Sequence, residues 1–147
     1  MGFEREGFQT SWFVENDPYC QAILRKHWPK TPIYGDIKKL DFTKLEHVDI
    51  LTGGFPCQDI SVAGKRKGMA GSRSGLWSEF SRAIGEIRPR YVVVENVPNL
   101  VNLGLEQVLA DFARAGYDTE HFMLRASSFG AVHRRKRIFI IATRCDF

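Results

Sequence analysis

Cysteine is scarce in this sequence, and its spacing excludes the sites that clustered cysteines usually build. The 147 residues include 3 cysteines, an odd number with no CxxC pair. We therefore expect neither a disulfide framework nor a metal site. Long apolar runs and a leader-like opening are also missing, and Glu6 stands where a myristoylation signal needs Ser or Thr. These absences predict a protein that is cytoplasmic or otherwise intracellular and has no membrane association.

Neither a strong net charge nor internal repetition marks the chain. The net charge is +4, the pI is about 9.1, and 44% of the residues are hydrophobic, so we expect a globular fold. No repeat, low-complexity tract or linker divides the sequence, which predicts one domain over residues 1–147. The cations gather at residues 65–67 and 134–137. Such clusters indicate phosphate contacts, or simply solvated faces.

Segments typical of strands and of helices alternate along the chain. Strands are predicted over residues 8–15, 31–34, 49–52, 91–94, 119–124 and 138–143, and helices over residues 17–27, 75–87 and 103–115. This order predicts an α/β fold with a mostly parallel sheet and helices on both faces. The unbroken apolar run at residues 91–94 is typical of a strand buried on both faces.

The first of these helices has a clear beginning in the sequence. Asp17 is expected to cap it, and Pro18 suits the first helical position. Its apolar residues are expected to face the core: Tyr19, Cys20, Ala22 and Ile23.

Polar or reactive residues follow the carboxyl ends of several predicted strands. They are Glu15, Asp36, Cys57 and Glu95. Ligands of open α/β sheets bind at this edge, so we expect the four groups to share one edge of one sheet. A carboxylate in the position of Glu15 commonly bonds a ribose diol, and Asp36 could accept a bond from an adenine amino group. Each could equally be a helix cap or a solvated strand end.

Cys57 lies in a turn built from Gly53, Gly54 and Pro56, where the backbone can approach a ligand closely. The segment that follows, to Gly75, is rich in glycine, serine and cations. Nearby positive charge favours the thiolate, which is the nucleophilic form of cysteine. Cys57 is therefore a candidate nucleophile; the alternative is a small apolar loop residue.

Glu95 and two arginines complete the candidate set. A glutamate at the mouth of a buried strand can act as a general acid, or it can accept bonds from the backbone of the next turn. Arg135 and Arg137 lie two apart just before a predicted strand, so they would point the same way and could hold a base carbonyl or a phosphate. The alternative is an exposed basic turn.

These motifs together resemble the cytosine-C5 DNA methyltransferases. The resemblance is carried by Gly-Phe-Pro-Cys-Gln at residues 54–58, Glu-Asn-Val at 95–97 and the basic run before Ile138, with Glu15-Asn16-Asp17 and Gly35-Asp36-Ile37 in the order of the cofactor-binding motifs. It covers essentially the whole chain. It implies a Rossmann-like methyltransferase sheet with a final antiparallel strand, and transfer of a methyl group from S-adenosylmethionine to cytosine in double-stranded DNA, as in bacterial and phage restriction-modification.

The resemblance also implies a role for each matching residue. Cys57 would attack C6 of a flipped cytosine, Glu95 would hold or protonate N3, and Arg137 with Arg135 would bind the cytosine carbonyl or the backbone near it. The residues implied to bind the cofactor are Glu15, Asn16, Asp36, Ile37 and Pro56. The residues implied to contact DNA are Gln58, Ser61, Lys65, Arg66, Lys67 and Arg73.

The sequence departs from the family pattern in ways that leave alternatives open. The family's first strand with its Phe-x-Gly-x-Gly loop, which cradles the cofactor, and its target-recognition region have no counterpart, and His133 replaces the usual glutamine. We therefore expect part of a catalytic domain, and an inactive or regulatory remnant or one half of a split enzyme completed by a second chain are alternatives. A cysteine hydrolase that uses Cys57 and His133 is a weaker alternative, because no feature brings the two together.

Overall fold

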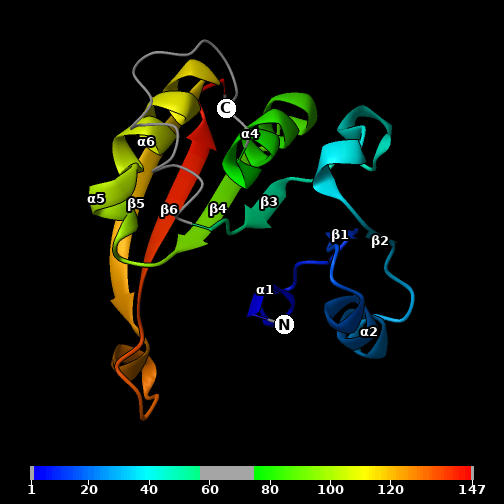
Figure 1. The fold of residues 1–147 in the computed structure, drawn as a ribbon, viewed down its shortest axis with the longest axis horizontal. Coiled ribbons are helices and arrows are strands. Elements are labelled where there is room, and N and C mark those ends of the chain that lie inside the picture. The colour runs from blue at the N-terminus through cyan, green and yellow to red at the C-terminus, as the bar shows by residue number, and fades with distance from the viewer. Residues whose placement is uncertain (1, 57–74, 147) are drawn as a thin grey trace. The chain divides into compact units, whose positions relative to one another are not determined.

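The computed structural model describes residues 2–56 and 75–146. The chain divides into two compact units, Met1–Glu46 and His47–Phe147, and each is considered by itself (Figure 1). In the described ranges no helix is both long and apolar enough to span a membrane.

The first unit has little regular structure. It contains α1 (Gly2–Arg5), β1 (Phe13–Val14), α2 (Pro18–His27), β2 (Ile33–Tyr34) and the short helices η1 (Ile37–Lys39) and η2 (Phe42–Lys44). The two strands pair in parallel, but each is shorter than predicted. The start of α2 is confirmed, because the Asp17 carboxylate accepts a bond from the Cys20 N–H at 2.9 Å and Pro18 opens the helix.

The prediction that α2 faces a core is wrong. Four of its residues are exposed: Tyr19, Cys20, Ala22 and Ile23. The sheet of this unit has two strands of two residues each, which offer too little apolar area to cover a helix face. Phe42 is the one buried residue that the structure describes in this unit.

The second unit contains a four-stranded sheet in the order β3-β4-β6-β5. Its elements are β3 (Ile50–Gly53), α4 (Leu76–Ile87), β4 (Tyr91–Asn96), α5 (Leu100–Leu103), α6 (Leu105–Arg114), β5 (Tyr117–Arg125), η3 (Ala126–Phe129) and β6 (Lys136–Arg144). Strand β3 runs parallel to β4, and β6 is antiparallel to both β4 and β5. A mostly parallel sheet with a final antiparallel strand is therefore confirmed.

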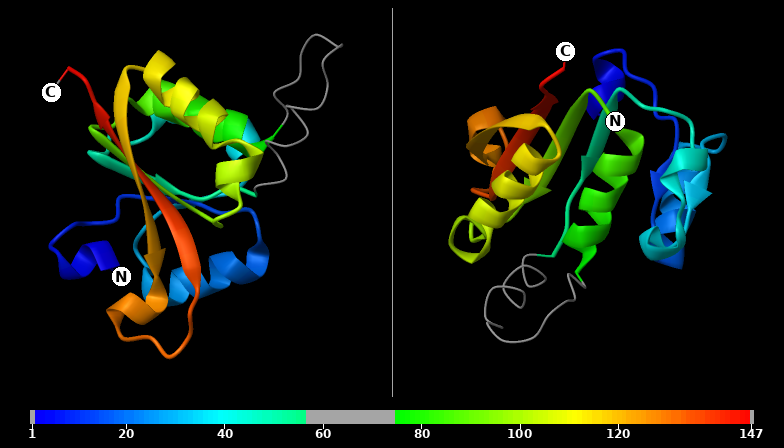
Figure 2. Two further views of the ribbon diagram at one scale, coloured as in Figure 1. Left: turned by 90° about the vertical axis from the view of Figure 1, so that its left-hand side faces the viewer. Right: turned by 90° about the horizontal axis from the view of Figure 1, so that it is seen from above.

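The core of this unit lies between one face of the sheet and helices α4 and α6, which Figure 2 shows on the same side. Val92, Val94, Ile138 and Ile140 are fully buried there. The alternate residues of β4, including Val93 and Glu95, are only half-buried, so the prediction of a strand buried on both faces is wrong. The two helices of this unit cover a single face, and the burial of β4 follows the two-residue period of a strand.

The described strands form two sheets rather than one. Strand β1 pairs with β2, and β3 pairs with β4; neither has a second partner among residues 2–56 and 75–146. Glu15 and Asp36 therefore follow the strands of one sheet, while Glu95 belongs to the other, and the expectation of a single shared edge is not met.

Candidate active site

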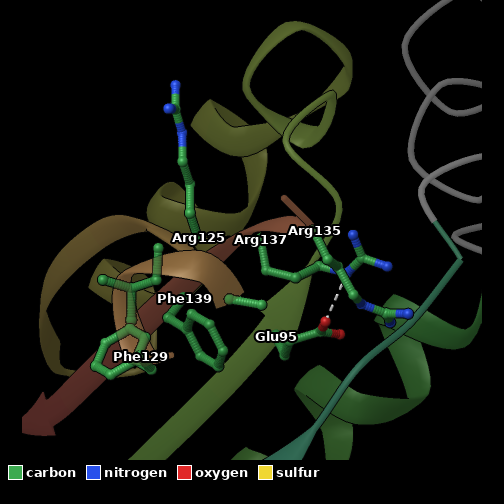
Figure 3. Close-up of a pocket in the computed structure, with 8 residues that line it drawn as sticks. Glu95, Arg125, Phe129, Arg135, Arg137 and Phe139 are labelled. Atoms are coloured by element: carbon green, nitrogen blue, oxygen red, sulfur yellow. Dashed lines mark ion pairs between the residues drawn. The ribbon is translucent and has the colours of Figure 1, made fainter. Parts of the chain in front are cut away.

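A pocket of about 270 Å³ opens where strands β4 and β5 end and β6 begins (Figure 3). It is lined by Glu95, Leu124, Arg125, Ala126, Phe129, Arg135, Arg137 and Phe139. Three arginines and one carboxylate give the pocket an excess of positive charge, and the aromatic rings supply flat apolar walls. Such a lining suits a planar ligand that carries carbonyl or anionic oxygens.

The Glu95 carboxylate and the Arg137 guanidinium form an ion pair inside this pocket. The distance from Arg137 Nε to Glu95 Oε1 is 2.8 Å, and the side chains are 23% and 43% exposed, respectively. The register explains the contact: Glu95 lies opposite Phe139 on β6, and Arg137 lies two residues earlier on the same face. Since Arg137 Nη1 also donates to the Lys136 carbonyl at 2.8 Å, the guanidinium is held by two bonds and keeps further donors for a ligand.

Arg135 lies beside this pair, whereas Arg125 extends away from the Glu95 carboxylate (Figure 3). The structure thus brings together three of the residues that the sequence predicts: Glu95, Arg135 and Arg137. Arg137 lies inside β6 and not before it, because the strand begins at Lys136.

The segment after β3 runs close to the strand that carries Glu95. A Cβ placed on Gly54 would lie 2.9 Å from the Glu95 carbonyl oxygen, so this approach requires glycine. Phe55 is buried, and its ring packs on Trp77 with centroids 4.9 Å apart. The Phe55 carbonyl accepts a bond of 2.8 Å from the side-chain amide of Asn96.

Glu15 and Asp36 follow the two neighbouring strands of the first unit. The Glu15 N–H donates to the Tyr34 carbonyl at 2.9 Å, which extends the pairing of β1 and β2 to this point. One Glu15 oxygen accepts a bond from the Asp17 N–H, and one Asp36 oxygen accepts from the Lys38 N–H. Each carboxylate therefore accepts a hydrogen bond from the backbone of the following turn, as expected of a helix cap or a strand end. Each also has a second oxygen that can accept a hydrogen bond from a ligand.

Comparison with known proteins decides the family. The sequence profile of the C-5 cytosine-specific DNA methylases matches residues 1–147. The chain belongs to this family.

Curated relatives agree with this assignment. The chain is 36% identical to the Type II methyltransferase M.AquIA of Picosynechococcus sp., covering 98% of this chain and 66% of that protein. It is also 36% identical to M.Eco47II of Escherichia coli, covering 99% of this chain and 37% of the relative. The chain thus spans less than two thirds of the length of either relative.

Two solved structures share the fold at low sequence identity. A mutant of Spodoptera frugiperda DNMT2 has a TM-score of 0.77 at 17% identity, covering 99% of this chain and 46% of that one. A putative DNA modification methyltransferase encoded within an E. coli prophage has a TM-score of 0.73 at 24% identity, covering 97% and 42%.

Membership of the C-5 methylase family implies S-adenosylmethionine as cofactor. The free carboxylate oxygens of Glu15 and Asp36 fit it chemically, since a ribose diol and an adenine amino group are both donors. Asn16 is exposed and Ile37 half-buried beside them, and Pro56 is exposed in the second unit. No cluster of metal-binding side chains occurs among the residues that the structure describes.

Several predicted residues lie outside the described residues. They are Cys57, Gln58, Ser61, Lys65, Arg66, Lys67 and Arg73. Within the described ranges, sequence reasoning missed Asn96, Phe129 and Phe139. The signal for Asn96 was present, because the alternation of β4 places it on the same face as Val92 and Val94. No sequence pattern predicted that η3 would place Phe129 in the pocket lining.

Proposed function

We propose that this protein transfers a methyl group to C5 of cytosine in DNA. The observation that supports this most directly is the Glu95–Arg137 ion pair in the pocket of a C-5 methylase family member. The pair offers a carboxyl group and guanidinium donors side by side: the carboxyl group, when protonated, can donate to the ring nitrogen N3 of cytosine, and the guanidinium can donate to the carbonyl on the same edge. A base inside a duplex cannot reach such a pocket, so the target cytosine must be flipped out.

In the proposed reaction the Cys57 thiolate adds to C6 of the cytosine. Glu95 holds or protonates N3 as charge builds on the ring, and Arg137, with Arg135, binds the carbonyl. Bound S-adenosylmethionine supplies an electrophilic methyl group. C5 would use its new electron pair to take that methyl group, and S-adenosylhomocysteine would be the leaving thioether; a base would then remove the C5 proton, and the electrons of the C5–H bond would re-form the C5–C6 double bond as the C6–S bond breaks and the Cys57 thiolate leaves.

The remaining predicted residues have binding roles in this proposal. Glu15 takes the cofactor ribose and Asp36 the adenine, and Asn16, Ile37 and Pro56 are the other residues proposed to bind the cofactor. The polar residues after Cys57 contact DNA: Gln58, Ser61, Lys65, Arg66, Lys67 and Arg73. Their cations would bind phosphates, so DNA affinity should fall as salt rises.

The test uses the complete protein in which this chain occurs. Wild type should transfer tritium from labelled S-adenosylmethionine to unmethylated genomic DNA, and it should form a denaturation-resistant adduct with DNA that contains 5-fluorocytosine. Cys57→Ser should do neither, because a neutral hydroxyl is a far weaker nucleophile than a thiolate. Cys20→Ser and Cys145→Ser are matched controls, since both thiols are exposed. Turnover or adduct formation by Cys57→Ser at the wild-type level would refute the proposal.

A second candidate function is that of an inactive or regulatory DNA-binding chain, or of one part of a split enzyme. The observation that favours it is that β1 and β3 each pair with a single strand in the described part of the chain. A strand edge of this kind can accept a strand from another chain. Methyl transfer by residues 1–147 that begins only when a second chain is added would support the split enzyme. Turnover by residues 1–147 alone would exclude both alternatives.

A further inference from the structure

Asn96 is an unusual residue for its position. Its side chain projects into the core of the second unit, where the residue is 5% exposed, and among the described residues it is the one buried residue with a fully polar side chain. Its neighbours on the same face of β4 are Val92 and Val94. An apolar side chain would fit such surroundings more simply, so the amide calls for an explanation.

Both ends of the Asn96 amide are used. Nδ2 donates to the Phe55 carbonyl at 2.8 Å, and Oδ1 accepts from the Val97 N–H at 2.8 Å. The parallel pairing of β3 with β4 ends at Gly53 and Val94. Among the residues that the structure describes, the next hydrogen bond between the two segments comes from the Asn96 side chain.

The same short segment is fixed at two further points. Gly54 passes so close to the Glu95 carbonyl that a Cβ would lie 2.9 Å from it, and the Phe55 ring packs on Trp77. Backbone approach, side-chain amide and ring contact together set the position of residues 54–55 along the end of β4. Loss of the hydrogen bond from the Asn96 side chain would leave the Phe55 carbonyl without this partner.

The position of residues 54–55 matters because they contact the strand that carries Glu95 and come just before Cys57 in the sequence. Glu95 and Asn96 are consecutive on β4, so Glu95 points to the pocket while Asn96 points to the core. Phe55 precedes Cys57 by two residues in the sequence. The Asn96–Phe55 bond therefore ties the stem that leads to the proposed nucleophile to the strand that carries the proposed acid.

We infer that Asn96 is a positioning residue for methyl transfer: it fixes the Phe55 carbonyl against β4 and so sets the stem before Cys57 relative to Glu95. This inference rests on the proposed function. Asn96 itself touches neither the base nor the cofactor in this arrangement. Its removal should slow the chemical step and leave binding nearly unchanged, because small errors in the placement of reacting groups are costly in rate.

The test compares Asn96→Asp with Tyr117→Phe in the complete protein. Asn96→Asp keeps the size of the side chain and the acceptor for the Val97 N–H, but it loses the donor to Phe55. Tyr117→Phe is the matched control, since it deletes another buried bond from a side chain to a backbone carbonyl, that of Pro89 at the opposite end of β4. Both variants should lower the melting temperature by a few degrees.

Only Asn96→Asp should lower kcat, by at least 10-fold, with the KM for DNA and for S-adenosylmethionine within threefold of wild type. Its adduct with DNA that contains 5-fluorocytosine should also form at least 10-fold more slowly. If Asn96→Asp does not fold, Asn96→Ser, which is smaller and uncharged, should show the same split between kcat and KM.

The outcomes separate this inference from the proposed function. If wild type neither turns over nor forms the adduct, the proposed function fails, and the inference fails with it. If wild type is active and the Asn96 variants keep kcat and the adduct rate within threefold, the inference alone is overturned. An equal loss of kcat in Tyr117→Phe would also overturn it, because the effect would then be a general one of lost stability.

Discussion

Arg137 Nε lies 2.8 Å from Glu95 Oε1, and the two residues come from adjacent antiparallel strands that are far apart in the sequence. The pair can exist because β6 lies between β4 and β5, which brings the basic run beside the Glu95 strand end. In the proposed function, the carboxyl group and the guanidinium held in this way form one recognition surface for a base edge. The pair is partly exposed, so its value lies in geometry more than in stability.

Replacement of Glu95 by glutamine should separate the contribution of the carboxyl group to catalysis from its contribution to stability. The variant keeps the shape of the side chain but cannot donate an acidic proton, so we expect methyl transfer to slow by about 10²-fold or more. The melting temperature should change little, since partly exposed ion pairs contribute only about 0–1 kcal/mol. Single-turnover kinetics and thermal melts of the same preparation measure both quantities. A rate loss below threefold would show that Glu95 only stabilises the turn after β4.

Alanine substitutions at Gly54 and Gly85 test the close approach of the Gly54 backbone to the Glu95 carbonyl, with Gly85 as the control. Gly54→Ala places a methyl group 2.9 Å from the Glu95 carbonyl, a backbone atom that cannot easily move, and should destabilise the protein by about 1–3 kcal/mol. Gly85 lies within α4 with nothing inside 4 Å of the added Cβ, so Gly85→Ala should stabilise by about 0.5–1 kcal/mol. Urea unfolding of both variants measures the change in unfolding free energy, which should be a loss for Gly54→Ala and a gain for Gly85→Ala. Equal effects would mean that the backbone is not close at Gly54.

Tyr117 should make stability depend on pH at the alkaline end. The phenol donates to the Pro89 carbonyl at 2.6 Å, and burial raises its pKa above the ordinary value of about 10. Because the folded state holds the proton more tightly, the stabilising contribution is fully present below pH ~10 and is lost as pH rises through the folded pKa.

The measurement is the difference in unfolding free energy between wild type and Tyr117→Phe from pH 8 to pH 11. The difference should begin near 0.5–1.5 kcal/mol, as estimated for one hydrogen bond at about its usual net value, and then shrink with rising pH. Subtraction of the variant removes the titration of the other groups. A difference that stays constant across the range would show that Tyr117 does not titrate with folding.

The sequence alone predicted those features that depend on local signals. Asp17 and Pro18 mark the start of α2, and Gly116, with φ of 82°, follows the helix predicted to end before it. Both depend only on neighbouring residues, so no tertiary information was needed. Glu95 and Arg137 could be named as candidates for the same reason, but their contact depends on the order of the strands.

The predictions that failed depend on tertiary contacts, which local sequence does not determine. The prediction that Cys20 and Ile23 face a core fails because burial requires a partner surface that the first unit does not supply. The apolar run of β4 suggested burial on both faces, while the helices of its unit cover one. The alternation of β4 places Asn96 on the core face, but its hydrogen-bond partner cannot be predicted locally, because Phe55 lies forty-one residues earlier in the chain.

The last prediction concerns the difference in stability between the two units. In the first unit the structure describes one buried residue, Phe42, and strands of two residues each, whereas Val92 and Ile140 are fully buried in the four-stranded sheet of the second. Short two-stranded sheets are marginal in water, and amide exchange follows local stability. We expect the amides of β1 and β2 to exchange about 100-fold or more faster than those of β4 and β6, which corresponds to about 2.7 kcal/mol.

Hydrogen–deuterium exchange with mass spectrometry measures this on residues 1–147, with and without S-adenosylmethionine. If Glu15 and Asp36 bind the cofactor, its addition should slow exchange in the first unit, because a ligand that binds only the folded form stabilises it. Asp36→Asn, which keeps an acceptor but adds a donor, should reduce that protection. Equal exchange in the two units without cofactor would show that the first unit is more stable than its small core suggests. Protection that is unchanged in a Glu15→Gln and Asp36→Asn double variant would remove both residues from the cofactor site.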